Sequence, residues 1–208
     1  MNDATRRPVK SRGVILFQKF AAWLARTGVT PNHISLASIF FAAIAAWFFT
    51  CSHYWILLAA AGIQLRLFCN LMDGMVAIEH QKETPTGELY NEIPDRFSDS
   101  LILVGIGLCP GVSMSLALAA ALAAMFTAYI RVLGASVGAR AHFAGPMAKQ
   151  QRMALLTLLA VAAPFLPTNS SFSYSHVCEI TLWIIAIGSV VTAFRRLHKI
   201  SVDLNSKA

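Results

Sequence analysis

The chain has 208 residues, of which 56% are hydrophobic and only 13% are charged. In soluble domains about a quarter of the residues are charged. This composition therefore excludes an ordinary soluble protein and indicates a protein that lies in lipid. The formal net charge of +7 would suggest a nucleic-acid partner in a soluble protein. In a membrane protein the position of the charges matters more than their sum, and we expect no nucleic-acid partner.

The first apolar segment, residues 13–25, is too short and too charged to span a bilayer, because Gln18 and Lys19 interrupt it. It predicts an amphipathic helix in the headgroup plane. The later apolar stretches are long enough for spanning helices, with breaks at Pro110 and Pro167. We therefore expect a single all-α integral membrane domain over residues 1–208, with six spans at about 32–51, 54–78, 91–109, 113–137, 152–166 and 177–197.

Lys and Arg residues lie on only one side of the predicted spans. The connections after the first, third and fifth spans contain neither residue type. The basic residues fall in the two termini, in the other connections, or in the helix halves next to them. By the positive-inside rule, both termini are expected in the cytoplasm, with the protein in the inner (cytoplasmic) membrane.

Two polar stripes lie where the second span ends and the third begins. Residues three or four apart share a helix face, so Asn70 and Asp73 form one stripe, and Asn91, Asp95 and Asp99 form the other. The short connection makes the two helices antiparallel neighbours, so the stripes are expected to face each other. Carboxylate and amide oxygens are ligands that Mg²⁺ prefers, and acids at membrane depth indicate function.

A second interpretation of these acids remains open. Structural ion pairs are a common cause of buried charge, and the nearby basic residues are Arg66, Arg96 and Lys82. The acids would then form an ion network at the membrane surface. Arg66, about one turn before Asn70, is a candidate partner for an acid or for a phosphate.

At these stripes the sequence resembles the CDP-alcohol phosphotransferase family. The family motif is Asp, two residues, Asp-Gly, two residues, Ala-Arg, eight residues, Gly, three residues, Asp, three residues, Asp, and the spacing agrees throughout. Asp73 and Asp95 match the second and fourth acids. The small motif residues are matched by Gly74, Ala77 and Gly87. Three positions depart from the motif, with asparagine at two acids and isoleucine at the arginine: Asn70, Asn91 and Ile78.

The resemblance implies a homodimer with a cytoplasm-facing cavity, two Mg²⁺ or Mn²⁺ ions, and CDP bound at Asp73, Gly74, Ala77 and Gly87. It makes Asp95 the general base that takes the proton of the acceptor hydroxyl. Asparagine brings no charge, so the two replacements are expected to weaken divalent binding, which puts full occupancy by two ions in question. By position the metal ligands are Asn70, Asp73, Asn91 and Asp95, and we add the hypothesis that Asp99 supplies a missing carboxylate.

A basic stretch connects the fourth and fifth predicted spans. It carries Arg140, Lys149 and Arg152, and Arg131 lies in the helix before it. Lys149 and Arg152 lie about one turn apart and suit a phosphate of the donor or of the acceptor. The alternative is that these residues only contact anionic lipid headgroups, and for Arg140 both interpretations stay open.

Together these features predict metal-dependent transfer of a phosphatidyl group from a CDP-linked lipid, such as CDP-diacylglycerol, to an alcohol, with release of CMP in phospholipid biosynthesis. One alternative is a relative that binds CDP-lipid or metal without turnover, because Asn70, Asn91 and Ile78 depart from the motif. A less favoured alternative is an ion-coupled transporter that uses the same intramembrane acids. The acceptor stays open among glycerol phosphate, inositol phosphate, serine and the headgroup of another lipid.

Overall fold

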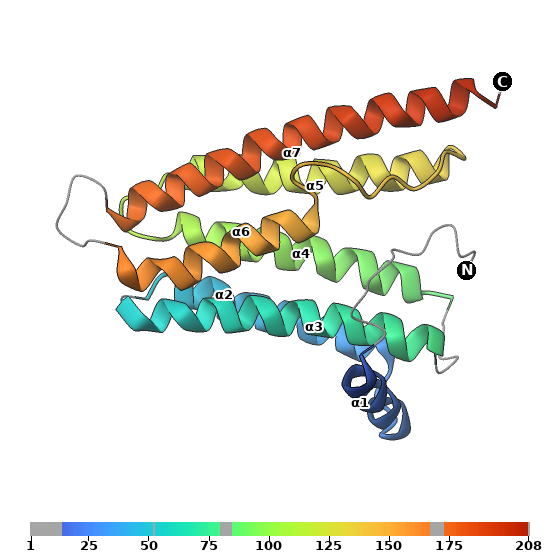
Figure 1. Cartoon of the computed structure of the whole chain (residues 1–208), viewed down its shortest axis with the longest axis horizontal. Coiled ribbons are helices and arrows are strands. Elements are labelled where there is room, and N and C mark those ends of the chain that lie inside the picture. Colours follow the sequence, from blue (N-terminus) through green and yellow to red (C-terminus); the bar gives the residue numbers. More distant parts are fainter. Residues whose placement is uncertain (1–13, 52, 80–84, 167–172, 208) are drawn as a thin grey trace.

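The computed structural model describes residues 14–51, 53–79, 85–166 and 173–207. Every regular element in these residues is a helix (Figure 1). The predictions that rest on residues 1–13, on Lys82 and on residues 167–172 lie outside this part of the chain.

In this part of the chain six long helices run alternately in opposite directions along the bundle (Figure 1). A short 3-10 turn, His53–Ile56, precedes the second of them, and another, Ala163–Phe165, follows the fifth. The fourth helix of the chain begins four residues before its predicted start, the sixth three residues before, and the seventh continues eight residues past its predicted end. The bounds are α2 Pro31–Phe49, α3 Leu57–Glu79, α4 Gly87–Gly107, α5 Met114–Ser136, α6 Lys149–Ala162 and α7 Tyr174–Asn205.

A shorter helix, α1 (Ile15–Arg26), lies across the end of the bundle instead of along it (Figure 1). It packs on α3 through Phe17 and Phe20, whose ring centroids lie 5.6 and 5.4 Å from that of Phe68. Its outer face leaves Trp23 56% exposed. A helix therefore occupies the predicted segment, and its position in the headgroup plane stays a prediction.

Four segments of the described chain are long and apolar enough to cross a membrane. They are Pro31–Phe49, Tyr54–Ile78, Met114–Ser136 and Tyr174–Asn205. The other two long helices fall short for different reasons, because α4 carries several charged residues and α6 has only 14 residues. The count of six spans stays a prediction.

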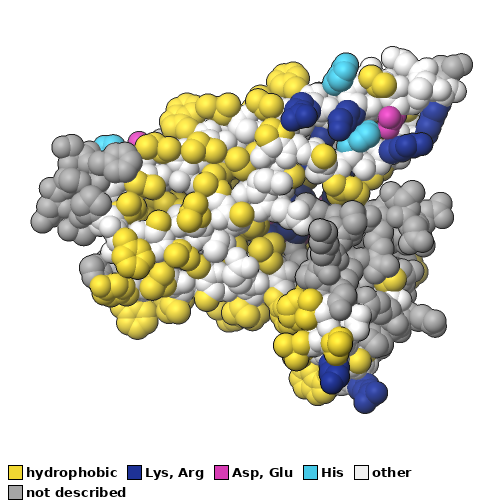
Figure 2. All heavy atoms as spheres, in the orientation of Figure 1, with side chains coloured by type: hydrophobic (Ala, Val, Ile, Leu, Met, Phe, Trp, Pro, Cys, Tyr) yellow, Lys and Arg dark blue, Asp and Glu magenta, His cyan; other side chains and the backbone are white. Residues whose placement is uncertain are grey.

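The surface separates apolar from basic side chains. Figure 2 shows hydrophobic side chains along most of the visible length of the bundle, with most of the visible Lys and Arg side chains on α1 and where α7 finishes. We call this end, where α3 also finishes and α4 begins, the basic end. The separation agrees with the distribution of Lys and Arg in the sequence.

Small residues let the helices approach closely, as is usual where lipid replaces water as solvent. A Cβ atom on Gly105 of α4 would lie 2.5 Å from the Cα atom of Ala46 in α2. A Cβ atom on Gly62 of α3 would lie 3.0 Å from the carbonyl oxygen of Phe41. Close backbone packing of α2 against α3 and α4 therefore fixes the position of the two helices that carry the acids.

We expect Gly105→Ala to lower the free energy of unfolding by about 1–3 kcal/mol, the usual cost of overpacking, because the new methyl group meets backbone. Gly134→Ala is the matched control, since its methyl group meets only the flexible end of the Ile200 side chain. Thermal unfolding in detergent measures both. Equal midpoints for the two variants would contradict the close approach of α2 and α4.

Candidate active site

Polar side chains of α2, α3 and α4 meet inside the bundle near the basic end. Asn70 donates a hydrogen bond from Nδ2 to Oδ1 of Asp95. Asp73 is 4% exposed, and its Oδ2 accepts a hydrogen bond of 2.6 Å from Ser35. The other oxygen, Oδ1, is buried and accepts no hydrogen bond from any described residue. The predicted facing of the two stripes is therefore seen for Asn70 and Asp95.

Asp95 is surrounded by positive charge. The Lys149 ammonium lies 2.5 Å from its Oδ2, and Arg66 lies 3.2 Å from its Oδ1. Arg96 approaches Oδ2 at 3.6 Å. These groups come from α6, α3 and α4, so one carboxylate joins three helices.

Asp99 lies one turn further along α4 and is paired on both oxygens. Arg66 donates to Oδ1 at 2.5 Å, and Arg152 donates to Oδ2 at 2.8 Å. Arg152 also donates to the carbonyl oxygen of Met147 at 2.9 Å. Because arginine takes both oxygens, nothing in this arrangement supports Asp99 as the substitute metal ligand, and that role stays a hypothesis.

The ion network considered as an alternative is therefore present for Arg66 and Arg96. Arg66 and Arg152 are 0% and 1% exposed, a degree of burial that charged groups reach only when they are paired. We call the set Asp95, Asp99, Arg66, Lys149 and Arg152 the ion ladder. The deep part of the ladder holds helices together, and its outer part borders the unpartnered oxygen of Asp73.

The remaining motif residues lie toward the basic end. Asn91 is exposed, one turn before Asp95. Gly74, Ala77 and Gly87 are half-buried, so backbone on this side is accessible. A ligand of some size can approach there because these side chains are small or absent.

Few side-chain oxygens in this region are available as ligands for a divalent ion. In the part of the chain that the structure describes, no three His, Cys, Asp or Glu side chains are grouped as a metal site. Asp73 offers a buried oxygen without a partner. Asn70 spends its amide N–H on Asp95, which leaves its carbonyl oxygen available as a ligand.

The four basic residues predicted as a phosphate clamp separate in space. Lys149 and Arg152 face the acids, as described above. Arg131 pairs with Glu92, and its guanidinium lies 5.3 Å from the ring centroid of Phe143. Arg140 is exposed, and its backbone N–H donates to Asp203 at 3.4 Å.

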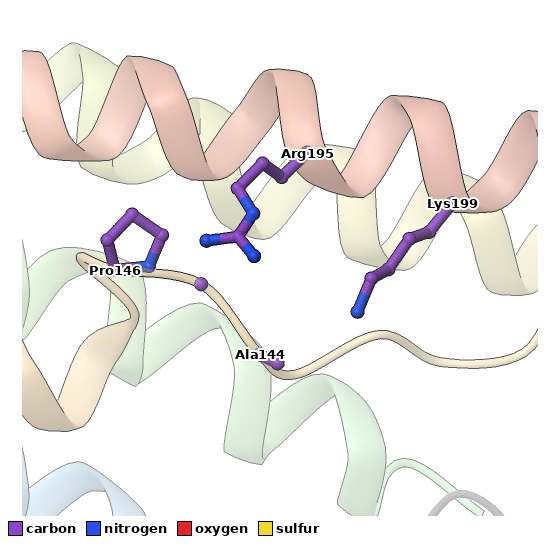
Figure 3. Close-up of a pocket in the computed structure, with 5 residues that line it drawn as sticks. Ala144, Pro146, Arg195 and Lys199 are labelled. Atoms are coloured by element: carbon purple, nitrogen blue, oxygen red, sulfur yellow. The ribbon is translucent and has the colours of Figure 1, made fainter.

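A second basic site was not predicted from the sequence. A pocket of about 250 Å³ is lined by Ala144, Gly145, Pro146, Arg195 and Lys199 (Figure 3). The figure shows both basic side chains extending from α7 toward the loop segment. Among the described residues neither forms an ion pair, and no acid lines the pocket. Their spacing of four residues was the available signal in the sequence, where both count only among the basic residues that indicate membrane topology.

The loop side of the pocket is fastened to α7. Arg196 donates to the carbonyl oxygen of Phe143 at 2.8 Å, and the N–H of Met147 donates to Oγ1 of Thr192 at 2.9 Å. A Cβ atom on Gly145 would lie 2.2 Å from Cγ2 of Thr192. Only glycine permits this approach, so the loop is held in place just before Lys149.

Comparison with known proteins gives a family match and several relatives. The family model for CDP-alcohol phosphatidyltransferase matches residues 28–194. Inner membrane protein YnbA of Escherichia coli is 27% identical over 147 residues, which cover 70% of this chain and 73% of that protein. Archaetidylinositol phosphate synthase of Aeropyrum pernix is 29% identical over 174 residues, covering 82% and 86% respectively.

The fold matches that of a solved membrane enzyme. The crystal structure of Mycobacterium tuberculosis phosphatidylinositol phosphate synthase PgsA1 with CDP-DAG bound aligns with a TM-score of 0.73 at 20% identity, covering 90% of this chain and 94% of that chain. The same enzyme has also been solved in complex with manganese and citrate, and that structure aligns with a TM-score of 0.72 at 20% identity, covering 89% and 88%. The apolar helices and these relatives together indicate an integral membrane protein.

We expect Arg66→Met to destabilise the bundle strongly, because it leaves Asp95 and Asp99 buried with fewer positive partners. Removing one partner of a buried ion pair costs about 3–5 kcal/mol. Arg26→Met, at an exposed position of α1, is the control and is expected to change stability by at most about 0.5 kcal/mol. Chemical or thermal unfolding in detergent measures the difference, and comparable stability of the two variants would refute a structural role for the ion ladder.

Proposed function

The chain belongs to the CDP-alcohol phosphatidyltransferase family, and we propose that it transfers a phosphatidyl group from a CDP-linked lipid to a phosphorylated alcohol, with release of CMP. The observation that carries this proposal is the buried, unpartnered oxygen of Asp73, about one helical turn from Asn70, which is hydrogen-bonded to Asp95, the partner of Lys149. The relatives named as phosphatidylinositol and archaetidylinositol phosphate synthases support this class of acceptor.

The donor is proposed to bind at the basic end, with its diphosphate near Asp73 and its CDP over Gly74, Ala77 and Gly87. These positions have little or no side chain, so the diphosphate and nucleotide can approach the backbone. The metal ligands are proposed to be Asp73 with Asn70 and Asp95, and Asn91 if its exposed side chain turns inward. When bound, a divalent ion such as Mg²⁺ or Mn²⁺ neutralises the diphosphate and stabilises the charge on the departing CMP.

Asp95 is proposed to accept the proton of the attacking hydroxyl. The acceptor oxygen forms a bond to the phosphorus that bears the lipid, and the bond from that phosphorus to the oxygen of CMP breaks. The Lys149 ammonium lies against Oδ2 of Asp95. A lysine ammonium on a flexible stem can turn toward an arriving diphosphate, which frees the Asp95 oxygen to take the proton.

The phosphate of the acceptor is proposed to bind in the pocket at Arg195 and Lys199. The pocket has two cationic side chains and no acid among its lining residues. Its loop continues directly to Lys149, so the pocket and the acids are joined by one short segment. Arg131 and Arg152 were also predicted to bind phosphate, but in the structure they pair with Glu92 and Asp99. Arg140, the third such residue, is exposed and is not among the lining residues of the pocket, so we assign this role first to the pocket.

Three further features remain proposals. The family resemblance supports a homodimer, and the distribution of Lys and Arg supports cytoplasmic termini in an inner membrane.

A protein that binds CDP-lipid without turnover remains the alternative, because Asn70 and Asn91 replace motif acids. Incubation with labelled CDP-diacylglycerol, Mn²⁺ and a panel of alcohols tests it: release of CMP supports the enzyme, and bound nucleotide without CMP supports the alternative.

We expect Asp95→Asn to lower the rate of CMP release by about 10²–10⁴-fold, the usual contribution of a general base, while CDP-diacylglycerol still binds. The amide keeps the shape of the side chain but is a far poorer proton acceptor. Glu179→Gln, whose carboxylate accepts from the N–H of Ser113 at the opposite end of the bundle, is the control and should retain activity. An Asp95→Asn protein with unchanged turnover would remove the proposed base.

We expect Arg195→Ala and Lys199→Ala each to raise KM for inositol phosphate or glycerol phosphate by roughly 10- to 100-fold, the value of a charged hydrogen bond, with little change in kcat. His198→Ala, at an exposed position on the same helix, is the control. In the same assays with unphosphorylated inositol or glycerol, the two substitutions should leave KM unchanged. A KM that changes equally for both kinds of alcohol would contradict a phosphate pocket.

A further inference from the structure

We propose that this chain binds a single divalent ion at Asp73, and that the Lys149 ammonium supplies the positive charge for which a second ion would otherwise be needed. The inference rests on the proposed function for the identity of the site. The number of ions that can bind depends on which acid oxygens already have partners.

The buried aspartates differ in the partners of their oxygens. Of the three aspartates that are buried in the described part of the chain, Asp95 is paired with Lys149 and Arg66, and Asp99 is paired with Arg66 and Arg152. Asp73 differs, because a neutral hydroxyl binds one of its oxygens and the other is buried without a partner among the described residues. A buried oxygen of this kind is costly unless something binds it, so it marks the place for one cation.

The charges of the buried cluster also limit the number of ions. The cluster holds three carboxylates, Asp73, Asp95 and Asp99, and four basic groups lie within 4 Å of the last two, Arg66, Arg96, Lys149 and Arg152, so basic groups already at least match the acids in number before any ion binds. Asn70 and Asn91 add oxygens but no charge. Affinity for divalent ions follows the number of charged ligands, and a second ion would bring two more positive charges to a cluster that has no carboxylate left to oppose them.

Lys149 lies beside Asp95 at the start of α6. Its ammonium lies 2.5 Å from Oδ2 of Asp95, and Oδ1 already accepts from Asn70 and Arg66, so both oxygens of this acid have partners. Lys149 is the first residue of α6 and follows the fastened loop, so its backbone is held in place. A lysine is a point charge well suited to a phosphate oxygen, so it can stand beside the diphosphate where a second ion would.

The experiment counts ions instead of turnover. The purified full chain in lipid nanodiscs, loaded with CDP-diacylglycerol, is titrated with Mn²⁺, and free Mn²⁺ is followed by electron paramagnetic resonance. We expect one Mn²⁺ per wild-type chain and none for Asp73→Asn. The double variant Asn70→Asp/Asn91→Asp restores two charged ligands and is expected to bind two, at the separation of about 3.5–4 Å typical of two-metal sites, which also couples their spectra.

Asp203→Asn removes a carboxylate that binds His142 far along α7, and it should still bind one ion. Thermal unfolding of each variant shows whether the protein is folded. Two ions or none on the wild-type chain would overturn the proposal, as would an ion that stays on folded Asp73→Asn, or a folded double variant that still binds only one. CMP release is measured on the same samples. One bound ion without CMP release would contradict the proposed function but leave this inference standing. Two bound ions with CMP release would contradict this inference but support the proposed function.

Discussion

The pairing of buried charge between α3, α4 and α6 is the constraint on which the rest of the structure depends. An ionised side chain inside a membrane protein costs several kcal/mol unless it is paired, and Arg66 is shared by Asp95 and Asp99 at 3.2 and 2.5 Å. Arg152 completes the pairing from α6 at 2.8 Å. These bonds fix the rotation of each helix about its axis, because turning any one of them would expose an uncompensated charge.

The same ladder separates structure from chemistry along its length. At its deep end both oxygens of Asp99 are taken by arginine, so this acid serves to hold the helices. At the basic end the partners are a lysine on Asp95 and a hydroxyl on Asp73, which a bound ligand can replace or supplement. The loop fastened to α7 then brings a second basic pocket close to the acids, and the two sites together form the basis for a donor and an anionic acceptor.

Much of this protein could be predicted from local sequence. Apolar runs and their polar breaks predicted the helices, because lipid exposure demands long apolar stretches. The spacing of Asn70, Asp73, Asn91 and Asp95 predicted facing stripes, because residues three and four apart share a helix face, and the Asn70–Asp95 hydrogen bond confirms that part. Helix ends were less well predicted, since α7 continues to Asn205 by packing and capping that hydropathy does not record.

What the sequence alone determined is the class of protein, the number and order of its long helices, and the family motif with its two asparagines. Only the tertiary structure decided which charges meet. Hydropathy and helix periodicity describe one helix at a time, so they could not distinguish the four basic residues Arg131, Arg140, Lys149 and Arg152, which have different partners in space. Nor could they show that Arg195 and Lys199 face a loop fastened beside α6, because that contact joins residues about 50 positions apart.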